Sequence, residues 1–426
     1  MQKPYAVLLC LFLASTLLAR CQSKAYELSQ HQFNFKGFAT TITDFATDEQ
    51  GNHLLVGWVD VVADLKKDRD TTLNRIFRLK DRGHSRKLGI AIATDQNFNI
   101  KQISRSFVGR KVIYDARQKQ FIIGASFFSY IVQKDDSFSA WQPIIIKTRI
   151  DLKQTVYLIK QPHSCLLEDI KLEGDNVLVF AHSFLHRSIL QAKREAVDVF
   201  RVNTARHQVD TTYGWMKSLE ILQTWRTNHA ETGGLTMSKV SQAKGGYYFS
   251  TSTFDQSEMK TTQHLYKFAN GSLTELPRYQ SLLKFSAGLS KRLSINDMAL
   301  NTKNQLVTVC HEVASDETMV YMKTDTSASK VLAKKDIPLH YYADVNRFCV
   351  LSNDHLVVLQ HNSGKTWSYY FYDQNMNLLQ EVKANVSKDH VPYALFESDE
   401  GIISATFTVN NKSQKDCVLQ QVPFKK

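Results

Sequence analysis

The sequence has little of several features that mark particular protein classes. Only 7 of its 426 residues are proline, and no Pro/Gly-rich stretch marks a linker between domains. After the first residues, no apolar run is long enough to span a bilayer. A phosphate-binding loop, a nucleophile elbow, an H-E-x-x-H motif and a dinucleotide fingerprint are all missing. These absences count modestly against the common enzyme classes, although a site can be assembled from loops that are distant in sequence.

Cysteine is also sparse. Two of the six cysteines, Cys10 and Cys21, lie in the N-terminal apolar region, and none of the others forms a C-x-x-C pair. Four cysteines in an exported chain allow three disulfide pairings, and buried free thiols are the alternative. The sequence leaves both possibilities open for Cys165, Cys310, Cys349 and Cys417.

The one long apolar run is at the N-terminus. Lys3 precedes roughly fifteen apolar residues, Tyr5 to Ala19, and polar chain follows; this layout is typical of a secretory signal and too short for a membrane span. We therefore expect a signal peptide over 1–23 and a mature chain over 24–426. The protein would be exported to the periplasm, the outer surface or the medium.

A lipid anchor at Cys21 is the rival interpretation of this end. Leu18 and Ala19 fit a lipoprotein signal, but Arg20 occupies the position that should be small. We therefore disfavour lipidation, and we expect no transmembrane span.

Basic residues exceed acidic ones, 53 to 41, giving a formal net charge of +12. Such a charge favours anionic glycans, lipid headgroups or acidic protein surfaces, although a solvated basic surface is the simpler interpretation. No nucleic-acid recognition module is visible, and we expect no nucleic-acid partner.

A hairpin pattern recurs along the chain. In "DFATDEQGNHLLVG" (44–57) a polar turn joins two short apolar strands, and similar hairpins follow at 112–128, 166–184, 237–254, 294–313, 342–362 and 392–409. Between them lies a second hairpin type with an Asp/Asn-containing turn, at 89–104, 144–160, 198–212, 264–277, 320–335 and 369–382. Two hairpins per unit make four antiparallel strands, repeated every 45 to 70 residues or so, which is typical of propeller blades.

We therefore predict an all-β fold, a single seven-bladed β-propeller of four-stranded antiparallel blades, closed by the N-terminal strand from 26–37. A β-sandwich array or two β domains are the alternatives. In texture the mature chain resembles exported β-propeller proteins of the WD40-like and quinoprotein-like kind, in particular those of bacterial envelopes. It lacks the Gly-His and Trp-Asp dipeptides of true WD40 blades.

Two stretches interrupt the repeat and supply the candidate binding residues. The first, at about 61–87, is charged and includes Lys66, Lys67 and Arg69. The second, at about 213–237, mixes aromatic and charged side chains. Loops that interrupt a rigid scaffold often carry binding residues, so we expect partner contacts from Trp215, Trp225, Arg226, His229 and Glu231; a solvated charge run and an insertion packed on the rim are the simpler alternatives.

Two further patterns have structural interpretations that we favour. His182 and His186 lie four apart, on one face of a strand, with His163 and Glu168 as the nearby residues that a metal would need. We expect hydrogen-bonded histidines there, and predict no metal site and no cofactor. Aspartates recur near unit starts, where they could bind a cation or act as acid and base, but we expect them to accept backbone N–H bonds between blades: Asp44, Asp115, Asp169, Asp297 and Asp344.

Two functions from different classes fit these patterns. The favoured one is an exported, non-enzymatic propeller that binds a protein or anionic glycan at the cell envelope. The alternative is a hydrolase or lyase acting on polysaccharide or peptide, with carboxylates at the channel mouth. The catalytic residues of such an enzyme cannot be named from the sequence.

Overall fold

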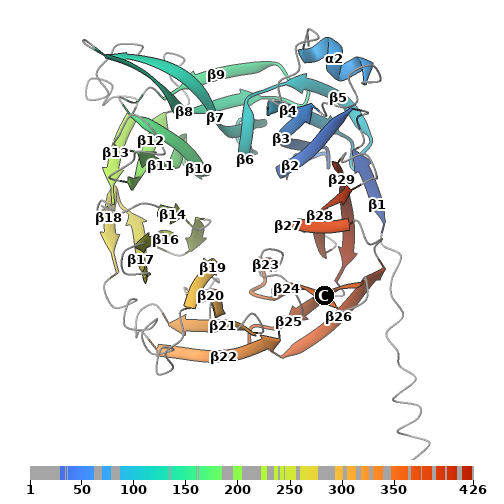
Figure 1. Cartoon of the computed structure of the whole chain (residues 1–426), viewed down its shortest axis with the longest axis vertical. Helices are drawn as coiled ribbons and strands as arrows, with labels where there is room; N and C mark the ends of the chain where they lie inside the picture. The colour runs from blue at the N-terminus through green and yellow to red at the C-terminus, as the bar shows by residue number, and fades with distance from the viewer. Residues whose placement is uncertain are drawn as a thin grey trace, which may run out of the picture.

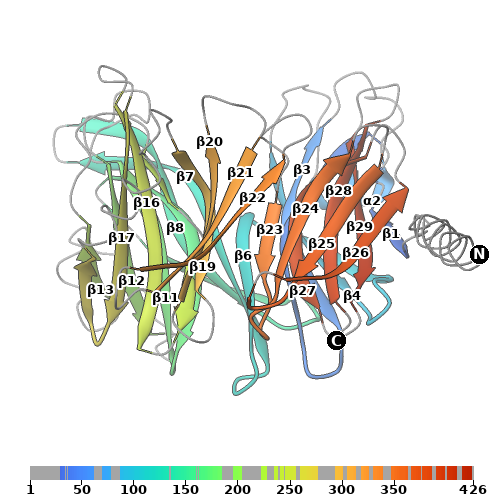
Figure 2. The same ribbon diagram turned by 90° about the horizontal axis from the view of Figure 1, so that it is seen from below.

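The computed structural model describes residues 29–424 with gaps at 34, 36, 62–69, 78–86, 134–135, 160, 162, 185–194, 204–221, 228–234, 238–239, 244, 256–259, 277–292, 301–304, 313–317, 326–329, 339–346, 363–365, 376, 386–389, 399–400 and 410–414. Within these residues the strands form six four-stranded antiparallel sheets and one five-stranded sheet. Figure 1 shows the sheets arranged in a ring about a common axis, and from the side the strands run between the two faces of the ring (Figure 2).

The sheets follow one another along the chain, so we number them in that order. The first contains β2 (Phe38–Thr47), β3 (His53–Val61), β4 (Leu88–Thr94) and β5 (Ile100–Arg105); the second β6 (Val108–Asp115), β7 (Gln120–Gln133), β8 (Asp136–Thr148) and β9 (Gln154–Leu158). The third contains β10 (Ser164–Glu173), β11 (Asn176–Phe184), β12 (Glu195–Asn203) and β13 (Leu222–Arg226). The fourth contains β14 (Leu235–Met237), β15 (Ser241–Ala243), β16 (Gly246–Asp255), β17 (Lys260–Ala269) and β18 (Ser272–Glu275).

The remaining three sheets have the same design. The fifth contains β19 (Leu293–Leu300), β20 (Gln305–Glu312), β21 (Thr318–Asp325) and β22 (Lys330–Pro338); the sixth β23 (Arg347–Val350), β24 (Leu356–Asn362), β25 (Thr366–Tyr372) and β26 (Leu378–Asn385). The seventh contains β27 (His390–Ser398), β28 (Gly401–Val409) and β29 (Lys415–Pro423), and its fourth strand is β1 (Gln30–Phe33), which pairs antiparallel with β29. The two ends of the chain therefore meet in one sheet.

The all-β, propeller-like architecture predicted from the repeat is confirmed. The seven hairpins of the first type supply the innermost strands of the seven sheets, and five of the six second-type hairpins supply the outer strands. The exception is 198–212. Its second strand was predicted within 204–212, which lies outside the described residues; in the described chain β12 pairs with β13, at Leu222–Arg226.

The first and third sheets are apolar on both faces and bury both by packing against their neighbours. Leu55 on β3 joins a cluster with Leu419 of the seventh sheet, whereas the adjacent Leu54 faces Ile123 of the second. The same division recurs in the third sheet, where Val179 packs toward the second sheet and Phe180 toward the fourth. Successive side chains of a strand point to opposite faces, and this is why continuous apolar runs fit this fold.

Several hairpins share a turn in which one aspartate organises five residues. The Asp95 carboxylate accepts the N–H groups of Asn97 and Asn99 at 2.8 and 2.9 Å, and the Asn99 side chain donates to its other oxygen at 3.0 Å. Asp48–Asn52 and Asp373–Asn377 repeat this arrangement. In two of these turns the fourth residue adopts positive φ, which glycine accepts readily: Gly51 (φ 78°) and Phe98 (φ 60°).

The charged segment 61–87 contains a described helix, α2 (Thr71–Phe77), which lies at the outer edge of the ring near β5 (Figure 1). Asp70 caps it, accepting the Leu73 N–H at 2.9 Å. Leu73 and Phe77 are buried in the cluster shared by the first and seventh sheets. Part of this segment is therefore anchored to the core. Among the helices that the structure describes, none is long and apolar enough to cross a membrane.

Candidate functional site: a buried polar cluster in the third sheet

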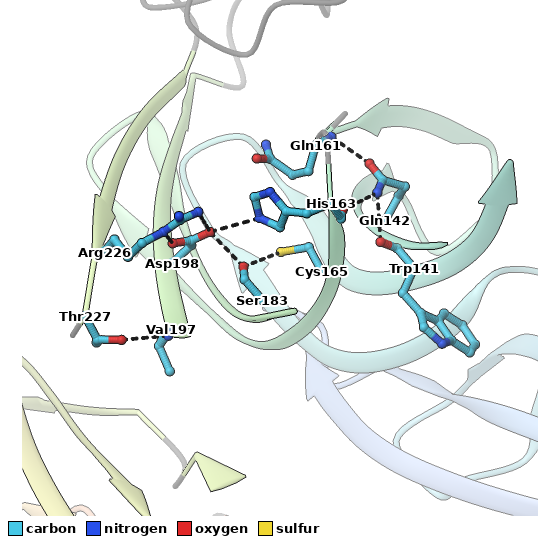
Figure 3. Close-up of polar contacts among 10 residues, drawn as sticks. All are labelled: Trp141, Gln142, Gln161, His163, Cys165, Ser183, Val197, Asp198, Arg226 and Thr227. Atoms are coloured by element: carbon cyan, nitrogen blue, oxygen red, sulfur yellow. Dashed lines mark hydrogen bonds and ion pairs between the residues drawn. The ribbon is translucent and has the colours of Figure 1, made fainter. Parts of the chain in front are cut away.

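A group of polar side chains that contact one another lies in the third sheet (Figure 3). His163 directly precedes β10, Cys165 and Ser183 face each other on β10 and β11, and Asp198 and Arg226 pair across β12 and β13. Five side chains from four neighbouring strands thus meet at one end of the sheet.

Asp198 is the centre of this cluster and is completely buried. Arg226 binds both carboxylate oxygens, with Nε–Oδ1 and Nη2–Oδ2 distances of 2.5 and 2.8 Å. Oδ2 also accepts the Ser183 hydroxyl at 2.7 Å and lies 3.3 Å from His163 Nε2. Burial alone raises the pKa of Asp198, but the bonds from His163, Arg226 and Ser183 outweigh it and leave the pKa lowered. Asp198 is therefore a stable anion that holds a cation at the sheet edge.

Cys165 is completely buried beside this anion, with its sulfur 3.2 Å from the Ser183 hydroxyl. Burial, and then the negative charge of Asp198, raise the pKa of the thiol far above its ordinary value. A neutral, inaccessible thiol is no nucleophile in this state. With His163 and Asp198 it nevertheless forms a group whose potential ligand atoms all lie within 4.8 Å of one another.

Contacts from the second sheet fix the chain at His163. The Gln142 side chain donates to the His163 carbonyl at 3.0 Å and accepts the Gln161 N–H at 2.6 Å (Figure 3). The Trp141 N–H donates to the Ser164 hydroxyl at 3.1 Å. These bonds connect β8 to the start of β10. The His163 imidazole consequently extends from a segment that is fixed by hydrogen bonds. The His163 side chain is 11% exposed.

A second buried pair lies next to the cluster. His182 Nε2 is 2.9 Å from the Glu195 carboxylate, and the Leu235 N–H of the fourth sheet donates to the same oxygen at 2.7 Å. The expectation of a hydrogen-bonded histidine at His182 is confirmed. His186 lies outside the described residues. Glu168, the other residue considered with these histidines, has its pKa raised by burial and is 3.4 Å from Arg110 of the second sheet.

The recurring aspartates have a different arrangement from the one expected. A β-bulge interrupts the innermost strand of five sheets, and the residue after it is aspartate in three of them: Asp44, Asp169 and Asp297. In the second sheet Lys111 follows the bulge, whereas Asp115 lies at the strand end and caps the next turn by accepting the Arg117 N–H at 3.1 Å. Grouping Asp115 with the others was wrong, because Lys111 occupies the position after the bulge in the second sheet and Asp115 lies four residues further along. Asp344 is outside the described residues.

The structural role expected for these aspartates is confirmed for two of them. Asp44 accepts the Val112 N–H of the next sheet at 2.9 Å, and Asp169 accepts the Val240 N–H of the next sheet at 2.9 Å. Both residues are buried. Each carboxylate therefore links neighbouring sheets at their inner strands.

Two of the predicted binding residues are described, and both lie in β13, a strand of the third sheet and not an interrupting loop. Arg226 is bound to Asp198. Trp225 packs edge-on against Phe268 of the fourth sheet, with centroids 4.7 Å apart, and Arg201 lies over its ring at 5.2 Å. β14 (Leu235–Met237), the first strand of the fourth sheet, also falls within the segment 213–237. The other predicted residues lie outside the described chain: Trp215, His229, Glu231, Lys66, Lys67 and Arg69.

Sequence reasoning missed Cys165 and Asp198 as members of one site. The available signal was the spacing of His163 and Cys165, because residues two apart at a strand start share a face. Nothing in the sequence indicated that Asp198, more than thirty residues later, would lie beside them.

Comparisons with known proteins show no family for this chain. No family model matches the sequence, and no curated protein matches it. Among solved structures, a protein of unknown function from Dyadobacter fermentans aligns with a TM-score of 0.45 and 6% identity, covering 93% of this chain and 99% of that one. The Pyrococcus horikoshii acylaminoacyl peptidase gives 0.47 and 9%, covering 89% of this chain and 50% of that one.

The WD40 domain of SCAP from fission yeast gives a TM-score of 0.39 and 8% identity, covering 92% of this chain and 87% of that domain. All of these scores are below 0.5. We transfer neither activity nor partner from these proteins.

Proposed function

We propose that this protein is an exported, non-enzymatic, closed seven-bladed β-propeller that binds a protein partner at the cell envelope. Export is proposed from the apolar run before Ser23, with the mature chain beginning at Lys24. Closure is supported by the antiparallel pairing of β1 with β29, which supplies the seventh sheet with a strand from the opposite end of the chain. Full closure removes exposed sheet edges.

One observation carries the binding proposal. β7 and β8, 14 and 13 residues long, form a hairpin that extends beyond the neighbouring strands β6 and β9. β6 pairs with β7 only as far as Ser126, and β9 pairs with β8 only from Ile144. Beyond these residues the two strands pair with each other, and the hairpin extends past the outer edge of the ring (Figure 1).

Phe128 and Trp141 form a cross-strand pair in this overhanging part of the hairpin. Their rings meet edge to face, 5.3 Å apart, and Phe128 is 59% exposed, the highest value among the exposed large apolar side chains of the described chain. Aromatic side chains with large exposed area are frequent anchors of protein interfaces. An apolar pair held on a rigid hairpin suits a protein surface better than a strongly hydrated glycan.

Strand direction supports one binding face. Because the outer strand of each sheet leads into the inner strand of the next, β3, β7 and β13 all end on the same face of the ring. The charged segment after Val61 and the segment after Arg226 therefore both depart from the face to which the β7–β8 hairpin projects. Basic residues predicted in the first segment would then add a salt-sensitive attraction to the aromatic contact.

The test is affinity capture from an envelope extract with the tagged chain from Lys24, washed over a series of salt concentrations. We expect a protein that survives high salt with the parent chain and is lost with Phe128→Ser. Leu378→Ser is the matched control, since Leu378 is 50% exposed on the sixth sheet, and it should capture as the parent does. Equal capture by Phe128→Ser, or only salt-labile material, would reject the proposed contact.

A hydrolase or lyase remains the second candidate because of Glu168. It is the bulge residue of β10, its side chain is 23% exposed, and burial raises its pKa, which suits a general acid. Turnover of a polysaccharide or peptide substrate that disappears with Glu168→Gln would favour this candidate over pure binding.

A further inference from the structure

We propose that the third sheet contains a zinc site formed by His163 Nε2, Cys165 Sγ and Asp198 Oδ2. This departs from the expectation of no metal that the sequence alone suggested. In the part of the chain that the structure describes, it is the one group of three such side chains whose ligand atoms lie within 4.8 Å of one another.

The distance between the nitrogen and the oxygen ligand atoms fits tetrahedral zinc. Zn–N and Zn–O bonds of about 2.0–2.1 Å at tetrahedral angles place the two ligand atoms about 3.3 Å apart. His163 Nε2 and Asp198 Oδ2 are 3.3 Å apart, a long hydrogen bond that a metal ion between the two atoms would replace. The Cys165 sulfur, two residues further along the chain than His163, lies within 4.8 Å of both of these atoms.

Ser183 marks the fourth corner. Its hydroxyl oxygen lies 2.7 Å from Asp198 Oδ2 and 3.2 Å from Cys165 Sγ, so it borders the space enclosed by the three ligand atoms. Either this hydroxyl or a water molecule that displaces it completes the coordination. Three protein ligands with one exchangeable position are a common zinc arrangement.

The surroundings hold each ligand in place. Arg226, on the outer strand, donates to Asp198 through Nε and Nη2. These bonds fix the carboxylate with Oδ2 facing His163. The Gln142 amide holds the His163 main chain at 3.0 Å. Outer partners that orient ligands in this way are a regular component of metal sites.

The chemistry of the three ligands selects the metal. Thiolate, imidazole and carboxylate together suit Zn²⁺, whereas Mg²⁺ and Ca²⁺ require all-oxygen sites. On binding, the Cys165 thiol loses its proton to solvent, and the two anionic ligands balance the charge of the ion. The Arg226 side chain is 29% exposed, so water can solvate its remaining charge.

The test uses the chain from Lys24, stripped with a chelator and loaded with Co²⁺ and, separately, with Zn²⁺. We expect one equivalent of Zn²⁺ per chain. We also expect Co²⁺ to give tetrahedral d–d bands with a thiolate-to-metal charge-transfer band. Cys165→Ser should abolish that band and weaken Zn²⁺ binding by more than the roughly 10- to 100-fold cost of losing an outer partner.

Cys349→Ser is the matched control, since Cys349 is also a buried cysteine but lies in β23 of the sixth sheet. It should leave both readouts unchanged. If Cys165→Ser fails to fold by circular dichroism, His163→Gln replaces it, because its side chain reaches the surface. Absence of the thiolate band in the parent chain, its persistence in Cys165→Ser, or an unchanged Zn²⁺ affinity in His163→Gln would overturn the proposal.

Discussion

Lys111 of the second sheet donates to Asp44 of the first, with a Nζ–Oδ2 distance of 2.9 Å, and both side chains are largely buried. Burial lowers the pKa of Lys111, but the charges of Asp44 and Asp169 outweigh it and raise the pKa. Lys111 follows the bulge in β6, and Asp44 follows the bulge in β2. Residues at the same position of two neighbouring inner strands therefore form an ion pair. The first and second sheets are therefore joined at their inner strands by an ion pair as well as by the hydrogen bond from the Val112 N–H to Asp44.

Lys111→Met should lower the free energy of unfolding by about 3–5 kcal/mol, because it leaves the buried Asp44 carboxylate without its cation. Urea unfolding checks this value. Lys153→Met is the control: Lys153 is 89% exposed and lies 3.7 Å from Asp151, so we expect a change within about 0.5 kcal/mol. Equal effects of the two substitutions would show that the pair does not stabilise the ring.

Asp198→Asn should also be strongly destabilising, by about 3–5 kcal/mol, because Arg226 would keep its charge without a carboxylate. Asp151→Asn, at a 47% exposed position, provides the comparison and should be nearly neutral. Unfolding curves followed by tryptophan fluorescence give the difference. A mild effect at Asp198 would indicate that water reaches Arg226 freely.

Phe33→Ala tests the pairing of β1 with β29. Phe33 is 1% exposed in the cluster between the first and seventh sheets, and loss of a buried phenylalanine side chain typically costs about 3–5 kcal/mol. Ile100→Ala, at a position 44% exposed, should have little effect. A stability unchanged by Phe33→Ala would mean that the N-terminal strand contributes nothing to the fold.

His53 should make the protein less stable on mild acidification. Burial lowers its pKa in the folded state from 6.5, against the opposing contributions of Gln96 and Asp48, and its ring stacks on Phe98 with centroids 4.1 Å apart. The folded state favours the neutral ring, so this contribution is complete above pH 6.5 and is lost as the pH falls below it. The free energy of unfolding should therefore change less between pH 7.5 and pH 5 in His53→Gln than in His355→Gln. His355, just before β24, is the control.

The sequence predicted the fold well because the relevant signals are local. Turns such as Asp95–Asn99 contain their own hydrogen-bond partners, and adjacent apolar residues such as Leu54 and Leu55 report two buried faces. The bulge that places Lys111 where Asp115 was expected leaves no such mark, since it depends on register with the partner strand. β13 was not predicted as the partner of β12, because a long connection separates the two strands in the sequence.

The candidate site was harder to predict for a related reason. Arg226 was identified as a chemically important residue, but the role assigned to it was surface binding. Its partner Asp198 lies directly across the sheet, a relationship that exists only after four strands have assembled. Sites built across strands remain hidden until the pairing is known.

The pairing of Gln30–Phe33 with Cys417–Gln420 has a consequence for biosynthesis. Among the strands that the structure describes, β1 is synthesised first, and its partner β29 becomes available only after nearly four hundred further residues. Contacts between such distant segments form slowly, so the N-terminal strand must wait as an unpaired edge while the intervening sheets assemble. A chaperone that shields this short segment during synthesis would act before β29 is available to pair with it.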